Sequence, residues 1–324
     1  MNFTQALSLC VASLFLSASI LTTSCTKTSN QEENAPIRLN VPLLQNYHSS
    51  EMTELWISQN DPTTQRHWTA RLTRPGTKLD WTIASAPEGQ ELRDHLADSA
   101  FISHLLSLFE TLQAIADAPQ GPPTSFALEP PIMGLKMSGG GKTYGINFGM
   151  PAPKNSGSYA YLPGPPASRV IVANGSVLEM LNMVNQFDVL RRRTLSTLTS
   201  DEVDEVELWR GKKKLIYAQR QGDDWADSKQ KKMRIPIQDV VEALTHLRIK
   251  SFVDDPGFAQ SALARLRNPE YRAVLKDRNG TSMEIRLAHS QALLFGVVSS
   301  RPKGVFEMHA DSTRFWNSTN FNGK

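Results

Sequence analysis

The sequence has little cysteine and no marked excess of one charge. Only Cys10 and Cys25 occur in 324 residues, so the chain after residue 25 has no cysteine for a disulfide, a thiolate metal site or a cysteine nucleophile. Lys and Arg number 35 against 32 Asp and Glu, which leaves a formal charge of +3. This small excess argues against nucleic acid as the main partner, because such binding requires a concentrated basic face.

Sequence motifs of enzymes are also missing. The chain has no Gly-x-Ser-x-Gly elbow, no supported Ser-x-x-Lys pair and no two His residues at metal-binding spacing. The seven His residues are His48, His67, His95, His104, His246, His289 and His309. We therefore predict no catalytic residue, no cofactor and no metal site, and we interpret the chain as a protein that is not an enzyme.

One glycine-rich segment looks like the end of a phosphate-binding loop. Residues 139–143 read Gly-Gly-Gly-Lys-Thr, but Lys136 stands where that motif requires its first glycine. The segment also lies between two alternating runs rather than between a strand and a helix. We predict a tight hairpin turn here.

The N-terminus predicts export and lipid attachment. The apolar run at residues 6–21 is short for a membrane span, which needs about 20 residues, and suits a signal peptide. Ser24-Cys25 at its end resembles the lipobox of bacterial lipoproteins, which implies lipidation of Cys25, although Thr22 replaces the usual Leu and the first five residues carry no Lys or Arg. We predict a signal peptide over 1–25 and a flexible tether over 26–49. An ordinary secretory signal or an uncleaved anchor is the alternative.

Two stretches of alternating residues predict β-hairpins, at 126–151 and 266–287. Apolar residues take every second position on both sides of a turn, which is typical of a half-buried antiparallel pair. The alternating residues are Met133, Leu135, Met137, Tyr144, Ile146 and Phe148, and later Tyr271, Ala273, Leu275, Met283, Ile285 and Leu287. The later turn is Asp-Arg-Asn-Gly at 277–280, and Asn-Gly is a strong hairpin signal because both residues tolerate positive φ.

The order of features then repeats along the chain. Glu207-Leu208-Trp209 matches Glu54-Leu55-Trp56, and Asp224-Trp225 matches Asp80-Trp81, with a lag of roughly 140 residues that drifts with loop length. Each half also has an amphipathic helical stripe. The stripes are Phe101, Leu105, Leu108, Phe109 and Leu112, and Ile237, Val240, Val241, Leu244 and Leu247. We predict an α+β protein with two tandem copies of an antiparallel hairpin sheet, at 50–198 and 199–318, with helices packed on one face.

Several segments carry a resemblance to a known family. These are ALEPP at 127–131, INFGMPAP at 146–153, and SYAYL at 158–162 followed by RVIVANGSVLEML. They resemble the bacterial envelope proteins with the domain of unknown function 4340, and the resemblance covers nearly all of residues 50–316. It implies a lipoprotein or a protein with a single anchor, often encoded beside ABC-transporter components linked to gliding motility. No established activity comes with it.

Three basic runs have two interpretations. Residues 191–193 are expected to end a helix and 212–214 to form a hairpin turn, with Lys229, Lys231 and Lys232 nearby. The alternative is contact with anionic lipid headgroups near the anchored surface.

The leading functional hypothesis is a non-catalytic envelope lipoprotein that binds a partner, with an ABC-type transporter or motility assembly as that partner and no nucleic acid. Lipid on Cys25 would anchor it to a membrane with the protein facing the periplasm. The outer membrane is favoured over the inner membrane. One alternative is a periplasmic carrier of a lipid or glycan. Another is a hydrolase with a site between the two repeats, for example around His104 or His246.

Overall fold

The computed structural model describes residues 40–61, 66–162, 169–184, 186–229, 231 and 236–316. The predicted signal peptide, the lipidated Cys25, most of the predicted tether and Lys232 lie outside these residues. The end of the predicted tether is part of the fold, since Leu43, Leu44 and Tyr47 are buried in the first core. No helix among the described residues has the length and apolar character needed to cross a membrane.

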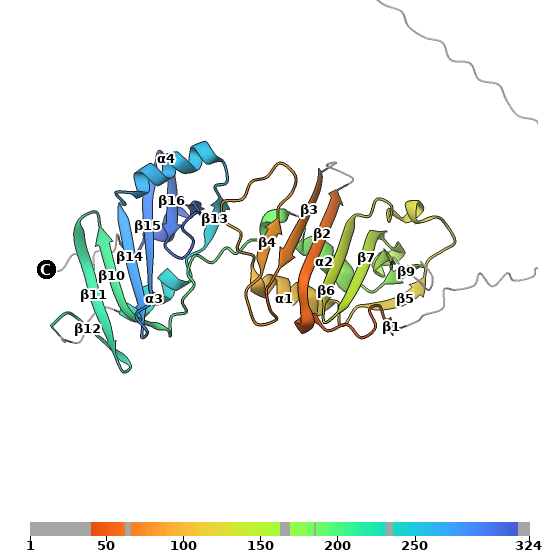
Figure 1. The fold of residues 1–324 in the computed structure, drawn as a ribbon, viewed down its shortest axis with the longest axis horizontal. Coiled ribbons are helices and arrows are strands. Elements are labelled where there is room, and N and C mark those ends of the chain that lie inside the picture. The colour runs from red at the N-terminus through yellow and green to blue at the C-terminus, as the bar shows by residue number, and fades with distance from the viewer. Residues whose placement is uncertain are drawn as a thin grey trace, which may run out of the picture. The chain divides into compact units, whose positions relative to one another are not determined.

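Nine strands form the first sheet. They are β1 Val41–Pro42, β2 Met52–Asp61, β3 Arg66–Thr73, β4 Thr82–Ser85, β5 Gln113–Asp117, β6 Met133–Gly139, β7 Lys142–Pro151, β8 Ser158–Tyr161 and β9 Val170–Ala173. Their order is β1-β5-β9-β8-β7-β6-β2-β3-β4, and every neighbouring pair is antiparallel (Figure 1).

Eight strands form the second sheet, also antiparallel throughout. They are β10 Val203–Arg210, β11 Lys213–Gln221, β12 Asp224–Ala226, β13 Ile249–Phe252, β14 Tyr271–Asp277, β15 Ser282–Ser290, β16 Leu293–Val298 and β17 Phe306–Met308. Their order is β12-β11-β10-β14-β15-β16-β17-β13. Four α-helices accompany the two sheets in the described part of the chain. They are α1 Ser99–Leu108, α2 Ser176–Met183, α3 Ile237–Thr245 and α4 Pro256–Leu266. The protein is therefore mostly β, with fewer helices than the predicted α+β class implies.

The two sheets use the chain in the same order. Counted from β4, the first sheet runs β4-β3-β2-β6-β7-β8-β9-β5, and the second runs β12-β11-β10-β14-β15-β16-β17-β13. The helices α1 and α3 occupy the same place in this order, between β4 and β5 and between β12 and β13. The correspondence predicted from the Glu-Leu-Trp and Asp-Trp segments thus relates strands at equivalent places, namely β2 to β10 and the start of β4 to β12.

Both predicted hairpins form, as β6–β7 and β14–β15. In the first, Met133 lies opposite Phe148 and Leu135 opposite Ile146, and all four side chains are buried. The turn consists of Gly140 and Gly141, which have φ of 56° and 75° and so use the left-handed conformation that a two-residue turn requires. The prediction that the glycine-rich segment is a hairpin turn, and not a phosphate-binding loop, is therefore confirmed.

Each sheet has an inner face that carries its main core. The first core joins Leu55 and Ile57 of β2 to Leu105 of α1 and Met180 of α2, and Figure 1 shows both helices behind the strands of this sheet. The second joins Leu208 of β10 to the side of α3 that was predicted from the sequence. We call the opposite face of each sheet its outer face.

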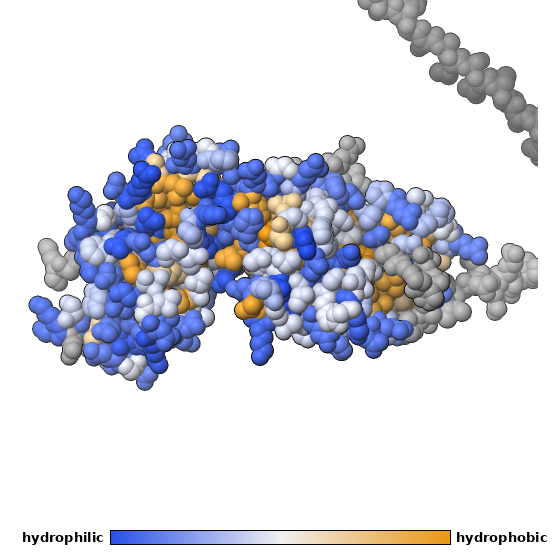
Figure 2. Space-filling model, in the orientation of Figure 1, coloured by the Kyte–Doolittle hydropathy of each residue, from blue (hydrophilic) through white to orange (hydrophobic). Residues whose placement is uncertain are grey.

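The helix α4 breaks the predicted one-face arrangement. Its Ala259, Ala262 and Leu266 pack with Phe295 and Val297 in a separate cluster on the outer face of the second sheet, whereas α3 packs on the inner face. An apolar patch is visible in Figure 2 where α4 lies over β15 and β16. The prediction that helices cover one face is therefore wrong for the second sheet. The cause is that alternate residues of β16 are apolar on both sides, so both faces need cover.

The same arginine arrangement occurs at one edge of each sheet. The Arg74 guanidinium lies 4.9 Å from the centre of the Trp81 ring, and that of Arg220 lies 4.7 Å from the Trp225 ring. In both cases the arginine Nε donates a hydrogen bond to the backbone carbonyl of the first residue of another strand. The acceptor is Met52 of β2 at 2.6 Å in the first sheet and Val203 of β10 at 3.0 Å in the second. Two elements of the repeat thus share side-chain contacts as well as strand order.

The basic run at 191–193 does not end the α-helix of this region, because it follows a single turn of 3₁₀-helix, Phe187–Leu190, that comes after α2. The helix α2 ends at Met183, and Arg191 is 1% exposed. Its guanidinium donates two hydrogen bonds to Asp254, at 2.5 and 2.9 Å, and lies 3.7 Å from the centre of the Phe252 ring. A buried ion pair requires such compensation because desolvation of each charge is costly. Arg191 is therefore a structural cation of the core rather than a membrane contact.

Candidate functional site

One interior strand of each sheet, β2 in the first and β10 in the second, places a tryptophan on the outer face. Trp56 in β2 donates from Nε1 to Glu54 at 2.9 Å, and Trp209 in β10 donates to Glu207 at 3.0 Å. Each glutamate stands two positions before its tryptophan. The two side chains lie on the same face of the strand, because side chains alternate with period two. This shared pair provides a reference from which the two outer faces can be compared position by position.

The outer face of the second sheet is filled by ion pairs around Trp209. The ring lies between Lys214 of β11, whose Nζ is 4.6 Å from its centre, and Arg272 of β14, whose guanidinium is 5.5 Å away. Lys214 also pairs with Glu207 at 2.9 Å, and Arg272 pairs with Glu284 of β15. The cations on this face thus have carboxylate partners, and both sides of the ring are covered.

Protonation equilibria on this face reflect the pairing. The hydrogen bond to Glu205 raises the pKa of Lys276. Burial by itself would raise the pKa of Glu207, but hydrogen bonds from Lys214 and Trp209 outweigh it and hold that pKa below its ordinary value. The charges of the second sheet are therefore matched to one another and fixed at neutral pH.

The first sheet has small residues at the equivalent positions. Lys136 lies opposite Trp56 as Arg272 lies opposite Trp209. Gly145 lies opposite Lys136, where the second sheet has Arg286 opposite Arg272.

Further along the same strands, Thr143 replaces Glu284. In the first sheet, Glu54 lies opposite Ser138, which lies opposite Thr143. In the second sheet, Glu207 lies opposite Val274, which lies opposite Glu284. The side chains that fill the second outer face are consequently missing from the first.

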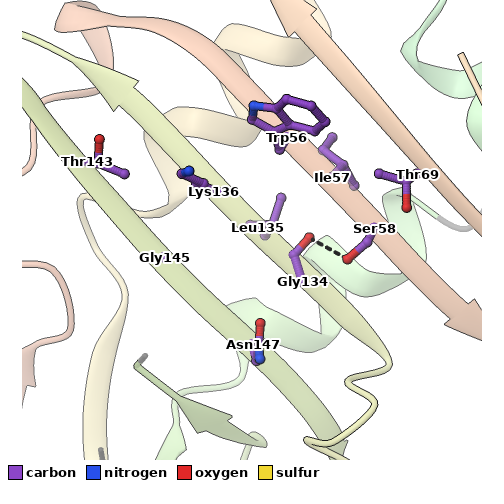
Figure 3. A pocket seen from close by; sticks show the side chains of 10 residues that line it. All are labelled: Trp56, Ile57, Ser58, Thr69, Gly134, Leu135, Lys136, Thr143, Gly145 and Asn147. Carbon is purple, nitrogen blue, oxygen red and sulfur yellow. Dashed lines mark hydrogen bonds between the residues drawn. The ribbon is translucent and has the colours of Figure 1, made fainter. Parts of the chain in front are cut away.

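These small residues leave a groove of about 620 Å³ on the outer face of the first sheet. It is lined by Trp56, Ile57, Ser58, Thr69, Gly134, Leu135, Lys136, Thr143, Gly145 and Asn147, and we call it the Trp56 groove (Figure 3). The lining comes from four adjacent strands, β3, β2, β6 and β7. Only one lining residue is charged, and it is a cation.

The floor of the groove depends on Gly134. The Ser58 hydroxyl donates to the Gly134 carbonyl at 3.4 Å, and a Cβ atom at this glycine would lie 2.6 Å from the Ser58 Oγ and 3.2 Å from the Asn147 Oδ1 (Figure 3). A side chain here would displace both polar groups. In the second sheet the residue two positions before Arg272 is Glu270, which instead binds His289 at 2.8 Å.

Trp56 is held firmly at one end of the groove. Besides the bond to Glu54, it has the Arg71 guanidinium 5.2 Å from its ring centre, and Arg71 pairs with Glu54 at 2.6 Å. Lys136 is exposed, and the described part of the chain gives it no carboxylate partner. The site therefore combines a fixed aromatic ring, an uncompensated ammonium group and several hydroxyl and amide groups.

The residues considered for catalysis from the sequence do not converge on this groove. His104 is exposed on α1. His246, at the end of α3, shares a separate hollow of about 380 Å³ with His309 and Asp311. Within the described residues, no group of three or more His, Cys, Asp or Glu is placed to hold a metal ion.

The groove residues were missed in the sequence analysis. Trp56 belongs to the repeated Glu-Leu-Trp segment and Lys136 lies before the glycine-rich turn, but neither pattern indicates a binding site, and no motif marks Gly145. The useful signal was the internal repeat, because aligning the two copies shows glycine where the second copy has arginine.

Comparison with known proteins gives one match. The model of the family described as a domain of unknown function, DUF4340, matches residues 81–269, which is more than half of the chain and includes parts of both sheets. No curated protein matches, and no solved structure matches.

Proposed function

Because the chain belongs to the family of proteins with the domain of unknown function DUF4340, we propose that it is a non-catalytic binding protein of the bacterial cell envelope. It acts as an accessory subunit of a membrane assembly, with an ABC-type transporter or a motility complex as the partner. Lipid on Cys25 would hold it at the membrane with the sheets facing the periplasm. The partner and the location rest on the N-terminal pattern and on the resemblance of the sequence.

One observation carries the proposal that the protein binds a partner or ligand. The same sheet position is closed by paired charges in the second sheet and open in the first, where Lys136 has no partner in the described residues and Gly145 takes the place of an arginine. An aromatic ring beside uncompensated polar groups is the usual composition of a recognition site. The Trp56 groove therefore supports a binding role.

We further infer that the two sheets are tandem copies of one unit. The common strand order and the Arg74–Trp81 and Arg220–Trp225 stacks support this inference. In this interpretation the second copy serves as a scaffold closed by its ion pairs, and the first copy carries the binding face.

A carrier for a glycan is the second candidate. A volume of about 620 Å³ lies in the range of sites that hold small ligands, which is about 300–1,000 Å³. The groove is open rather than enclosed, and Ser58, Thr69, Thr143 and Asn147 add hydroxyl and amide groups to its lining, which favours a glycan over a lipid.

The test is a crosslinking pull-down from native membranes, read by mass spectrometry. Wild type is compared with Cys25→Ala, with Gly145→Arg, which places in the groove the side chain found in the second sheet, and with Lys213→Gln, which removes an exposed cation of the second sheet. Wild type and Lys213→Gln should recover transporter or motility subunits. Recovery should fall with Cys25→Ala and be lost with Gly145→Arg.

If Gly145→Arg recovers the same subunits as wild type, the groove is not the binding face. If no transporter or motility subunit crosslinks to wild type, the accessory role is wrong.

A further inference from the structure

We propose that the Trp56 groove binds an acidic saccharide, that is, a short chain of sugar rings with a carboxylate group. This inference rests on the proposed binding role in its second form, the glycan carrier, and names the ligand class of the same site. Charge, the aromatic ring, the polar lining and the position of the groove in the sheet each support it.

The charge of the groove is that of a single cation. Lys136 is the one charged residue among those lining the groove, and the nearby Glu54 is already paired with Arg71. A lysine ammonium group acts as a point charge, unlike the planar fork of arginine that suits bidentate recognition. The single positive charge of one ammonium group balances the single negative charge of one carboxylate. A group with two negative charges, such as a phosphate, would be only half neutralised.

The aromatic ring offers one free side. In the second sheet Trp209 has a cation on each side, from Lys214 and Arg272. Among the residues that the structure describes, Arg71 on the β3 side is the one cation that lies over the Trp56 ring, and the groove lining toward β6 and β7 includes Lys136 and the small residue Gly145 (Figure 3). A sugar ring has apolar C–H groups on its faces and hydroxyl groups at its edge. A rigid tryptophan face is suited to the former.

The polar lining suits the hydroxyl groups. Ser58, Thr69, Thr143 and Asn147 contribute hydroxyl and amide groups, each of which both donates and accepts hydrogen bonds. They extend over four strands, a width of about 14 Å at the usual strand spacing. That width favours several linked rings over a single one.

Two other ligand classes fit the groove less well. An added peptide strand requires a sheet edge, but β2 and β6 are central strands with backbone partners on both sides. A fatty acyl chain requires an apolar enclosure, whereas this groove is open along the sheet and Lys136 in its lining is charged.

The experiment is a calorimetric titration of the full chain with tetragalacturonate, with its methyl ester as the uncharged counterpart and with a phosphorylated oligosaccharide. Wild type should bind the acid at least about tenfold more tightly than the ester, which corresponds to about 1.4 kcal/mol. The key variant is Thr143→Glu, which places a carboxylate where Glu284 pairs with Arg272, so that it neutralises Lys136 from within the site.

Thr143→Glu should weaken binding of the acid by about tenfold or more. The matched control, Thr143→Gln, has almost the same shape as Thr143→Glu without the charge, so it should lose clearly less affinity for the acid than Thr143→Glu does. Both changes are at an exposed strand position, so folding should be preserved, and circular dichroism checks this.

Three results would overturn the inference: no binding of the acid by wild type, equal binding of acid and ester, or equal loss with Thr143→Glu and Thr143→Gln. Tighter binding of the phosphorylated oligosaccharide would reject the carboxylate assignment. The pull-down separates the two proposals. If transporter or motility subunits still depend on an open groove, the binding role stands and only the saccharide assignment fails.

Discussion

At the scale of single residues, Glu307 of β17 links the last two strands of the second sheet through its side chain. Its carboxylate accepts hydrogen bonds from Lys250 at 2.5 Å and from Ser251 at 2.7 Å. These hydrogen bonds hold the pKa of Glu307 below its ordinary value of 4.5. A carboxylate with a lowered pKa in the folded state stabilises the protein above its unfolded pKa and loses that effect as the pH falls through the folded value.

We therefore expect wild type to exceed Glu307→Gln in free energy of unfolding at pH 7, by on the order of 0.5 kcal/mol for a partly exposed pair. The difference should persist down to about pH 5 and disappear at lower pH, below the ordinary glutamate pKa. Urea unfolding of both proteins between pH 7 and pH 3 measures it. A difference that stays constant over this range would contradict the assigned role of the carboxylate.

At the scale of elements, the β6–β7 hairpin depends on a close approach to the start of β2. A Cβ atom at Gly139 would lie 2.1 Å from the Glu51 carbonyl oxygen, which is a backbone atom and cannot move aside cheaply. Gly141, two residues on, has open space around it but a φ of 75°. The two glycines are thus needed for different reasons, the first for space and the second for conformation.

We expect Gly139→Ala to lower the free energy of unfolding by about 2 kcal/mol or more, because the backbone must shift. Gly141→Ala should cost about 1 kcal/mol, the usual cost of the left-handed conformation for a residue with a side chain. Chemical denaturation of both variants gives the comparison. Equal costs would show that the approach to Glu51 is relieved elsewhere in the hairpin.

The elements that the sequence predicted are those governed by local rules. Alternation and turn chemistry predicted both hairpins, and their cross-strand pairing comes from the structure. The helix α1 begins after Asp98, which accepts a hydrogen bond from the Phe101 amide at 3.0 Å. The helix α4 was overlooked, although Asp255-Pro256 is a usual helix start and Asp255 accepts from the Phe258 amide at 2.6 Å. At the equivalent place in the first copy there is only a single turn of 3₁₀-helix, Pro123–Phe126.

The first helix shows the limit of periodicity. The stripe at residues 101–112 implied three turns, but α1 ends at Leu108, and Ile102 and Leu106 are buried where Phe101 and Leu108 are only partly so. Leu112 is buried, but it lies beyond the end of α1, so its place in the helical stripe does not reflect a helical conformation. Packing against the sheet, which the sequence does not display, decided which side turned inward.

At the scale of the whole molecule, two buried ion pairs join segments that lie far apart in the sequence. Arg191 precedes the second sheet and binds Asp254, next to β13, while Arg301 of the second half binds Asp94 of the first. Arg301 also donates to the backbone carbonyls of Thr194 and Arg192, both at 3.1 Å. No periodicity reports a contact across 207 residues, which is why these pairs, like the Trp56 groove, could not be predicted from one pass along the chain.

The Asp94–Arg301 pair allows a test of how strongly the two halves depend on each other. Arg301 is 3% exposed and Asp94 is 7% exposed, so removing one partner leaves the other charge buried and uncompensated. We expect Asp94→Leu and Arg301→Met each to cost about 3 kcal/mol in free energy of unfolding. The double variant should cost less than the sum by about 1.5 kcal/mol or more.

The exposed pair Asp117–Arg169 is the matched control, and the same cycle there should give a coupling below about 0.5 kcal/mol. Urea unfolding followed by tryptophan fluorescence is measured for all seven proteins, because the two cycles share the wild type. Because the buried pair joins the two halves, wild type should unfold in one transition, whereas the single variants should separate the sheets into two. A coupling at Asp94–Arg301 no larger than in the control would mean that the pair does not hold the halves together.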